Sequence, residues 1–149
     1  MRVLLVYANQ SRDLLPPPPV GIAYVAGAAA RAGHEVEVVD LLVSRNGSAG
    51  LHAALRRLRP EVIGFSVRSI DNVVPQRWAS HLDSVAELIA AVRRGSAAAV
   101  VVGGPAISIL GAQALIMKSC AAKPIACSTG GRPSRRRMAR LSQGPASTV

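Results

Sequence analysis

The stretch AAAVVVGGPAISILG, residues 97–111, joins a buried strand to a sharp break in the chain. Its first six residues are small or β-branched and apolar, which is typical of a strand inside a parallel sheet. Gly103 and Gly104 lack side chains, so a flat group or a sugar could lie against their main chain, and Pro105 fixes the direction of exit. A tight strand-to-helix turn would use the same three residues. The stretch therefore predicts a strand of a parallel sheet and leaves the purpose of the break open.

Strand-like and helical segments alternate before this stretch. Apolar runs of strand length and segments of helical spacing follow one another over the first 110 residues. Ser84 and Glu87 have the spacing of a capping box, so we expect the third helix to begin at Ser84. The order predicts an α/β fold: a doubly wound parallel sheet, flavodoxin-like or Rossmann-like, with four clear strands and helices on both faces. The expected strands are residues 2–8, 34–41, 61–67 and 97–102, and the expected helices are residues 20–33, 50–60 and 84–95.

The last part of the chain has a different composition. Residues 111–149 hold seven Lys or Arg and no Asp or Glu, whereas residues 1–110 hold eleven against eight. A fifth strand is doubtful, because KPIACS, residues 123–128, is its only candidate. We expect a domain over residues 1–115 and a basic, disordered tail over residues 116–149. Our hypothesis is that the tail reflects a frameshift or a truncated gene model, which would leave the fourth strand as an unpaired edge.

Composition also limits the compartment and the partners. No apolar run approaches the eighteen residues of a membrane span, and the first residues lack the apolar stretch and cleavage site of a signal peptide. We therefore expect a cytoplasmic protein without a membrane partner. Cys120 and Cys127 are too few for a disulfide scaffold and lack metal-ligand spacing. The basic segment RPSRRRMAR, residues 132–140, has no interleaved aromatic residues, so nucleic acid is not the expected partner.

The loops that follow the strands carry the candidate ligand-binding residues, because ligands of open parallel sheets bind beyond the carboxyl ends of the strands. After the third strand, Ser66 places a hydroxyl in an apolar strand end, where it needs a hydrogen-bond partner. That partner could be a ligand or a neighbouring carbonyl, and Arg68 with Asp71 could form a surface ion pair. The polar residues after the first strand are Asn9, Gln10 and Ser11.

Common phosphate-binding and catalytic motifs are missing from these loops. The loop YANQSRDLLPPPPVG after the first strand contains no G-x-G-x-x-G, no Walker A motif and no flavin-phosphate loop. Phe65 and Ser66 stand where a receiver domain would need its phospho-accepting Asp. His34, His52 and His81 form no triad with a nucleophile. We therefore expect no catalytic residue, no protein-bound metal, and a ligand held by main chain and neutral polar groups.

Three motifs are specific enough for comparison with known families. They are the Pro-x-Gly-x-x-Tyr stretch of Pro19, Gly21 and Tyr24, the loop SVRSIDN, and GGPA; the segment RAGHEVEVVD adds a weaker match. Together they resemble the N-terminal cobalamin-binding domain of cobalamin-dependent radical SAM enzymes. The resemblance implies that the nucleotide tail of cobalamin enters a slot beside the first, third and fourth strands. Ser66 would lie near the benzimidazole, and Gly103 and Gly104 would give it room. The expected cofactor-binding residues are Asn9, Gln10, Ser11, Ser66, Val67, Arg68, Gly103, Gly104 and Pro105.

The chain departs from the family pattern in two respects. Other cobalamin domains carry Asp-x-His-x-x-Gly after the first strand, with a His that ligates cobalt, whereas residues 9–12 here read NQSR. The resemblance therefore implies cobalamin bound base-off, with its benzimidazole displaced and no protein His on cobalt. The chain also has no Cys-x-x-x-Cys-x-x-Cys, so we expect no iron–sulfur cluster and no catalysis by this chain alone. A radical SAM partner or a missing C-terminal domain would then supply the reaction.

Two other functions stay open. RAGHEVEVVD, residues 31–40, is shared with many doubly wound enzymes, including glycosyltransferases, so the chain could be the N-terminal half of such an enzyme. The basic tail could alternatively make it an interaction protein. Retention of a base-off corrinoid would favour the cobalamin-binding module over the glycosyltransferase half. Nucleic-acid binding that is lost when residues 116–149 are removed would favour the interaction protein.

Overall fold

The computed structural model describes residues 1–9, 18–44, 48–71, 80–111 and 126–127 of the chain. Strands and helices alternate along these residues, as the apolar periodicity predicts. None of the described helices is long and apolar enough to cross a membrane. The elements are β1 (Arg2–Tyr7), α1 (Val20–Arg31), β2 (Glu35–Asp40), α2 (Ser48–Leu58), β3 (Val62–Ser66), α3 (His81–Gly95), β4 (Ala99–Gly103), α4 (Pro105–Leu110) and β5 (Ala126–Cys127).

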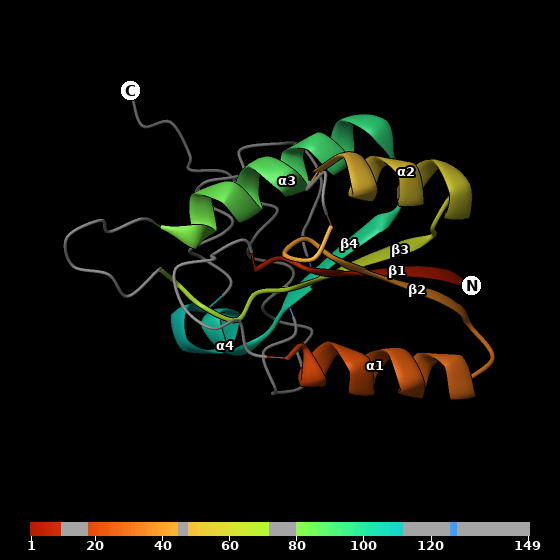
Figure 1. Cartoon of the computed structure of the whole chain (residues 1–149), viewed down its shortest axis with the longest axis horizontal. Coiled ribbons are helices and arrows are strands. Elements are labelled where there is room, and N and C mark those ends of the chain that lie inside the picture. Colours follow the sequence, from red (N-terminus) through yellow and green to blue (C-terminus); the bar gives the residue numbers. More distant parts are fainter. Residues whose placement is uncertain (10–17, 45–47, 72–79, 112–125, 128–149) are drawn as a thin grey trace, which may run out of the picture.

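The strands form one parallel sheet in the order β2-β1-β3-β4-β5. Figure 1 shows α2 and α3 on one side of this sheet and α1 on the other. Parallel neighbours need crossover connections, and the helices between successive strands provide them. The predicted fold class, a flavodoxin-like doubly wound α/β sheet, is confirmed.

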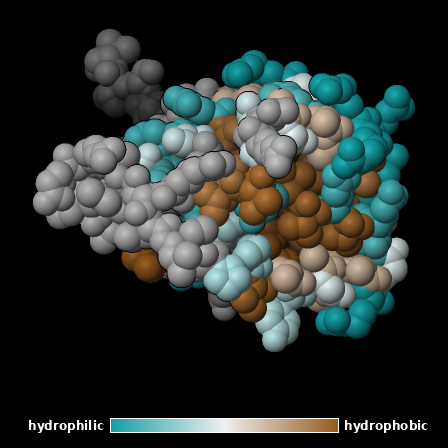
Figure 2. Space-filling model, in the orientation of Figure 1, coloured by the Kyte–Doolittle hydropathy of each residue, from teal (hydrophilic) through white to brown (hydrophobic). Residues whose placement is uncertain are grey.

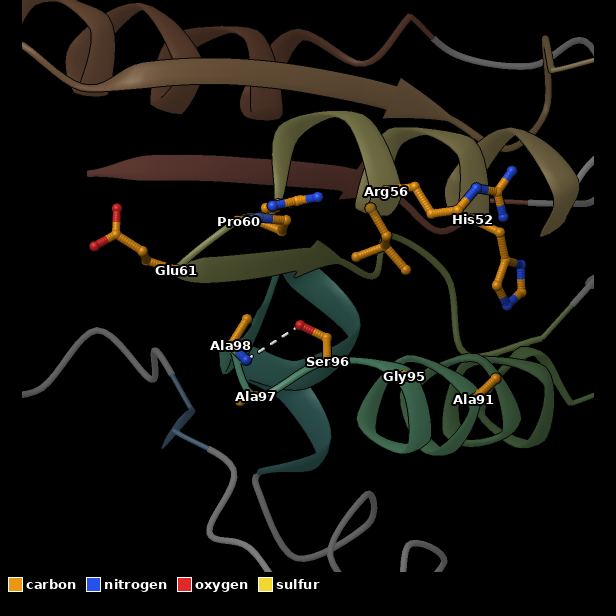
Figure 3. A pocket seen from close by; sticks show the side chains of 11 residues that line it. His52, Arg56, Pro60, Glu61, Ala91, Gly95, Ser96, Ala97 and Ala98 are labelled. Carbon is orange, nitrogen blue, oxygen red and sulfur yellow. Dashed lines mark hydrogen bonds between the residues drawn. The ribbon is translucent and has the colours of Figure 1, made fainter.

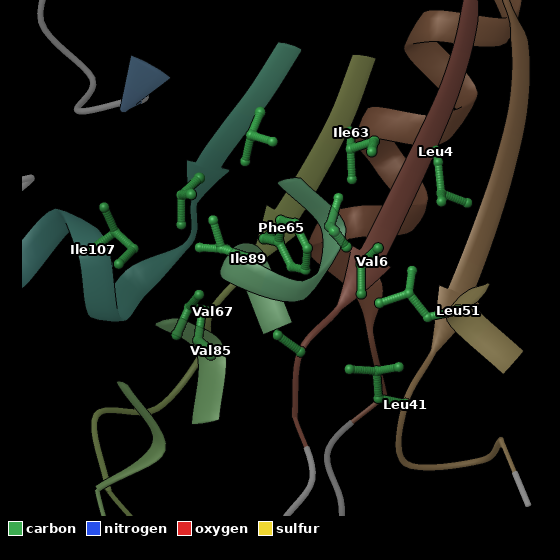
Figure 4. Close-up of a cluster of buried hydrophobic side chains, with 14 of the residues drawn as sticks. Leu4, Val6, Leu41, Leu51, Ile63, Phe65, Val67, Val85, Ile89 and Ile107 are labelled. Atoms are coloured by element: carbon green, nitrogen blue, oxygen red, sulfur yellow. The ribbon is translucent and has the colours of Figure 1, made fainter. Parts of the chain in front are cut away.

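The main core lies between the sheet and helices α2 and α3 (Figure 4). Leu4, Ile63 and Val100 form one row across β1, β3 and β4, and all three are buried. Leu51 from α2 and Ile89 from α3 pack against the same side. Since side chains alternate between the two faces of a strand, every second residue of β3 and β4 belongs to this core.

The opposite face of the sheet has a smaller core. Val3, Leu5 and Tyr7 of β1 pack there with Ile22 of α1, and α1 contacts β1 and β2. Over β3 and β4 this α1-side face is only partly buried. The α1-side residues of β3 and β4 are Val62, Gly64, Ser66, Ala99, Val101 and Gly103, of which Ala99 is exposed and the rest are half-buried.

Helix α3 begins one turn earlier than the sequence pattern predicts. It starts at His81, and the N-cap residue is Ser80, whose side chain makes no capping hydrogen bond. The prediction that Ser84 caps the helix is wrong. Burial of Leu82 in the core and a hydrogen bond from the His81 N–H to the Ile70 carbonyl (2.9 Å) extend the helix past the capping-box signal.

A short fifth strand is present within the predicted KPIACS segment. Ala126 and Cys127 pair in parallel with Val101 and Val102 of β4. The expectation that β4 is an unpaired edge is therefore wrong at these two positions. Two residues give a periodicity signal too short to recognise in a sequence.

At the other end of the sheet, β2 forms an edge. Figure 2 shows apolar side chains gathered on this side of the molecule, between α1 and helices α2 and α3. On β2 itself, Val38 is 43% exposed. Glu35, Glu37 and Asp40 place charges along the same strand, and charges on an edge strand oppose pairing with another chain.

Candidate functional site

The site follows from the order of the strands. From β1 the chain crosses first to β2 on one side and later to β3 on the other, so the order reverses between β1 and β3. In sheets of this order, ligands bind in the crevice outside the carboxyl ends of the strands at that reversal. The relevant residues are therefore those that end β1 and β3, with the neighbouring end of β4.

Those ends lie side by side in register. Tyr7 is the Cα partner of both Asp40 on β2 and Ser66 on β3, and Ser66 is the partner of Gly103 on β4. Register partners in a parallel sheet point to the same face, and Tyr7 points to the α1 side. We call these four residues, Asp40, Tyr7, Ser66 and Gly103, the end row. Two of its members, Ser66 and Gly103, were predicted as cofactor-binding residues and are brought together.

Main-chain hydrogen bonds hold the end row. The Ala8 N–H donates to the Ser66 carbonyl (3.1 Å), and the Val67 N–H donates to the Gly103 carbonyl (2.8 Å). These bonds continue the sheet one residue beyond the strand ends, so the three carboxyl ends leave the sheet at the same level.

Ser66 is half-buried, and within the described chain its hydroxyl has no hydrogen-bond partner. The alternative that the Ser66 hydroxyl donates to a neighbouring carbonyl is thus not seen among these residues. Arg68 is exposed and takes part in no ion pair with another described residue, so the alternative of a surface pair between Arg68 and Asp71 is not seen either. Both side chains stand at the edge where a ligand would lie.

Val67 differs from the other predicted residues. Its side chain is 2% exposed and belongs to the main core. Its N–H is bonded to Gly103, and its carbonyl accepts the N–H of Ala106 (3.2 Å). With side chain and both main-chain groups in use, Val67 positions the loop and joins the end of β3 to the start of α4.

A glycine at position 104 is needed for this connection between the end of β3 and the start of α4. Its φ is +105°, and a Cβ there would lie 2.5 Å from the Val67 carbonyl oxygen and 2.8 Å from the Val67 nitrogen. The alternative of a tight strand-to-helix turn therefore explains Gly104, because its missing side chain makes room for the Val67 backbone directly after β3. Pro105 starts α4 as its first residue, where a missing N–H costs nothing.

Gly103 differs from Gly104 in its backbone conformation and surroundings. It ends β4 with a negative or extended φ, is half-buried, and follows Val101 and Ala99 on the α1 side. Together with Gly64 and Ser66 of β3 it forms a partly exposed strip of small residues. The Leu5 side chain covers Gly64 in this strip, since a Cβ on Gly64 would lie 2.8 Å from Leu5 Cδ2. A strip of this kind fits a flat ring system better than bulky residues would.

The residues predicted after β1 are placed in part. Asn9 is half-buried directly beyond the end row and has an interaction partner. Gln10 and Ser11 lie outside the described residues.

Sequence reasoning missed Tyr7. It is 3% exposed, and its hydroxyl is a buried side-chain oxygen without a hydrogen-bond partner among the described residues. The signal in the sequence is a single hydroxyl at the end of the apolar run RVLLVY. The pattern alone reads as strand, and only the register places it beside Ser66.

A separate cavity of about 850 Å³ lies at the opposite edge of the sheet, between α2 and α3 (Figure 3). Pro60, Glu61 and Ala98, which precede β3 and β4, line it together with His52 and Arg56 of α2. It is open to solvent, and its lining mixes apolar and charged residues. Since ligands of this fold bind at the carboxyl ends of the strands, this cavity is not the expected site.

A parallel sheet with polar and small residues gathered at its reversal point defines a ligand-binding doubly wound domain. The chain belongs to the B12 binding domain family, whose family model matches residues 14–122. The resemblance drawn from the sequence motifs is thereby confirmed. A comparison with curated proteins gave no match.

Two solved structures are similar to this chain. Both are TsrM, a radical S-adenosylmethionine methyltransferase from Kitasatospora setae, with 31% sequence identity and a TM-score of 0.68. One holds a tryptophan substrate and the SAM analog aza-SAM, and the other holds cobalamin and a [4Fe-4S] cluster. The match covers 78% of this chain but only 21% and 20% of the TsrM chains. This chain therefore spans about a fifth of their length.

Proposed function

We propose that this chain is a cobalamin-binding module that holds the cofactor by its nucleotide tail on the α1 side of β3 and β4. The observation that supports this most is the end row together with the strip of small residues beside it. Gly103 ends β4 without a side chain, and Ser66 offers a hydroxyl that no described residue satisfies. The family match and the cobalamin-bound TsrM structure support the same ligand.

The cobalt is proposed to bind without a protein histidine, in the base-off form. His34 precedes β2 at the amino end of the sheet, and His52 lies on α2 beside the separate cavity. His81 begins α3, at the carboxyl edge, and its N–H is bonded to the Ile70 carbonyl. His81→Ala therefore tests the proposal: the visible spectrum of bound corrinoid is expected to stay unchanged. A changed spectrum would show that this histidine ligates the metal.

The module is proposed to lack catalytic activity alone. Its two cysteines, Cys120 and Cys127, are too few for the three-cysteine iron–sulfur motif. A radical SAM partner or further domain would carry the reaction, in keeping with the much longer TsrM chains. The domain boundary at residue 115, the truncation behind it, the basic tail and the cytoplasmic location stay predictions.

The proposal is tested by retention of hydroxocobalamin. The chain is mixed with excess hydroxocobalamin, desalted, and its visible absorption is recorded. Gly103→Val puts a branched side chain on the strip, and because Gly103 has no positive φ the backbone is not strained. We expect at least tenfold weaker retention.

The matched control is Ala99→Val, on the same strand and face but at its exposed, amino end. It is expected to retain the corrinoid like the unmodified chain, with circular dichroism confirming that both variants fold. Equal retention by Gly103→Val and Ala99→Val would contradict the placement. No retention by the unmodified chain would contradict the function and leave the glycosyltransferase-like and interaction readings.

A further inference from the structure

Tyr7 presents a polar group that the fold itself does not use. It is 3% exposed, and its ring packs with Val3, Leu5 and Ile22 in the smaller core. Among the described residues its Oη is the buried side-chain oxygen or nitrogen that lacks a hydrogen-bond partner. A buried hydroxyl without a partner loses its bonds to water and gains none in return, which destabilises the folded chain. A phenylalanine would fill the same core at no such cost.

The position of this hydroxyl links it to the proposed ligand site. Tyr7 is the last residue of β1, at the point where the strand order reverses. It lies in register between Asp40 and Ser66, on the α1 side. The Asp40 carboxylate is engaged locally, since its Oδ1 accepts the N–H of Leu42 (2.9 Å). Ser66, on the other side, is the half-buried residue next to the open strip.

The chemistry of a phenol restricts what it can recognise. Its O–H donates one hydrogen bond, and the buried position excludes bulk water from that bond. Tyr7 packs with Ile22 and Leu5 in a core cluster, which favours a slender group over the broad corrin ring. The nucleotide tail is such a group, and it carries ring-nitrogen and sugar-oxygen acceptors. The fitting ligand atom is therefore an acceptor of the nucleotide.

We infer that Tyr7 is a cofactor-positioning residue whose hydroxyl donates a hydrogen bond to the nucleotide of bound cobalamin. This inference rests on the proposed function and extends it to a residue outside the predicted set. Tyr7 and Ser66 would then hold the tail from adjacent strands, and the hydroxyl would gain its partner only when the cofactor binds.

Tyr7→Phe tests the inference with two ligands. Cobalamin carries the nucleotide, and cobinamide is the same corrinoid without it. We expect Tyr7→Phe to raise the dissociation constant for cobalamin about fivefold, the effect of losing one neutral hydrogen bond, and to leave that for cobinamide unchanged. Without ligand, Tyr7→Phe is expected to melt at the same temperature as the unmodified chain or higher, because an unsatisfied hydroxyl has been removed.

The matched control is Tyr24→Phe, which removes the same atom from a tyrosine that is 75% exposed on α1. It is expected to change neither affinity nor melting temperature. Unchanged cobalamin affinity in Tyr7→Phe, or equal losses for cobalamin and cobinamide, would overturn the inference while the proposed function stands. A lower melting temperature of ligand-free Tyr7→Phe would also overturn it, because the hydroxyl would then serve the fold. If the unmodified chain binds neither corrinoid, the proposed function fails and this inference fails with it.

Discussion

Gly104 has a structural task that can be separated from ligand binding. Its φ of +105° lies where side chains are disfavoured, and the space a Cβ would occupy is filled by the Val67 backbone. The contact fixes the end of β3 against the start of α4, and so sets the level of Ser66 and Gly103 in the end row.

Gly104→Ala is therefore expected to lower the free energy of unfolding by at least about 2 kcal/mol, from the unfavourable φ and the clash together. Chemical denaturation measures it. The control is Gly21→Ala, in α1, where a Cβ meets no atom within 4 Å; helix propensity predicts a gain of up to about 1 kcal/mol there. A loss for Gly104→Ala no greater than about 0.5 kcal/mol would show that the two backbones do not meet as closely as described.

Individual residues show what a sequence can and cannot predict here. The places of Ser66 and Gly103 at strand ends were predictable, because a polar residue and a glycine at the ends of apolar strands stand out in the pattern. The role of Gly104 was not predictable, since it depends on the Val67 carbonyl oxygen, which would lie 2.5 Å from a Cβ on Gly104. The unpartnered hydroxyl of Tyr7 was not predictable either, because its lack of a partner is evident only when its neighbours across the sheet are known.

The amino ends of β1 and β3 are joined by a reciprocal pair of contacts. The Arg2 N–H donates to Glu61 Oε2 (2.8 Å), and the Glu61 N–H donates to the Arg2 carbonyl (2.9 Å). The first of these bonds lowers the pKa of Glu61 below its ordinary value, with smaller contributions from the N-terminal amino group and the Arg2 side chain. The charged carboxylate is thus favoured in the folded chain.

A lowered pKa in the folded chain means that Glu61 stabilises the fold above the ordinary carboxylate pKa and that this stabilisation is lost as the pH falls through the lowered value. We expect the melting temperature of the unmodified chain to fall more steeply than that of Glu61→Gln between pH 5 and pH 3. Because the carboxylate is exposed, the difference is expected to be small and to shrink with added salt. Parallel pH profiles would refute the coupling.

Helix α3 offers a test of where an element begins. A capping-box reading predicts that Ser84→Ala costs about 1 kcal/mol. The structure places Ser84 inside the first turns, after His81 and Leu82, where alanine is a better helix former. We therefore expect Ser84→Ala to change the free energy of unfolding by less than about 0.5 kcal/mol in either direction. A loss near 1 kcal/mol would return the start of the helix to Ser84.

Among the elements, apolar periodicity predicts every described strand of five or six residues and the three longer helices to within a few residues. It fails where tertiary contacts determine whether an element forms or where it begins. The start of α3 is one such case, and the two-residue β5, defined by its pairing with Val101 and Val102, is another. Parallel order is predictable from the alternation of strands and helices, whereas the register that builds the end row is not.

In the whole molecule, the two faces of the sheet differ in cover. Helices α2 and α3 bury one face, while on the other the α1-side strip of β3 and β4 stays partly exposed. The strip lies beside the switch point of the sheet, and the chain spans about a fifth of the TsrM chains it resembles. This combination is the basis for the proposal that the ligand surface of the module is part of the sheet itself.

An equilibrium titration of the full chain with hydroxocobalamin, followed by visible absorption, decides whether that surface is a corrinoid site. The account predicts saturable binding of one corrinoid per chain, with the absorption of a base-off form, and weaker binding of cobinamide because it lacks the tail. Absence of binding, or equal affinity for cobalamin and cobinamide, would contradict it.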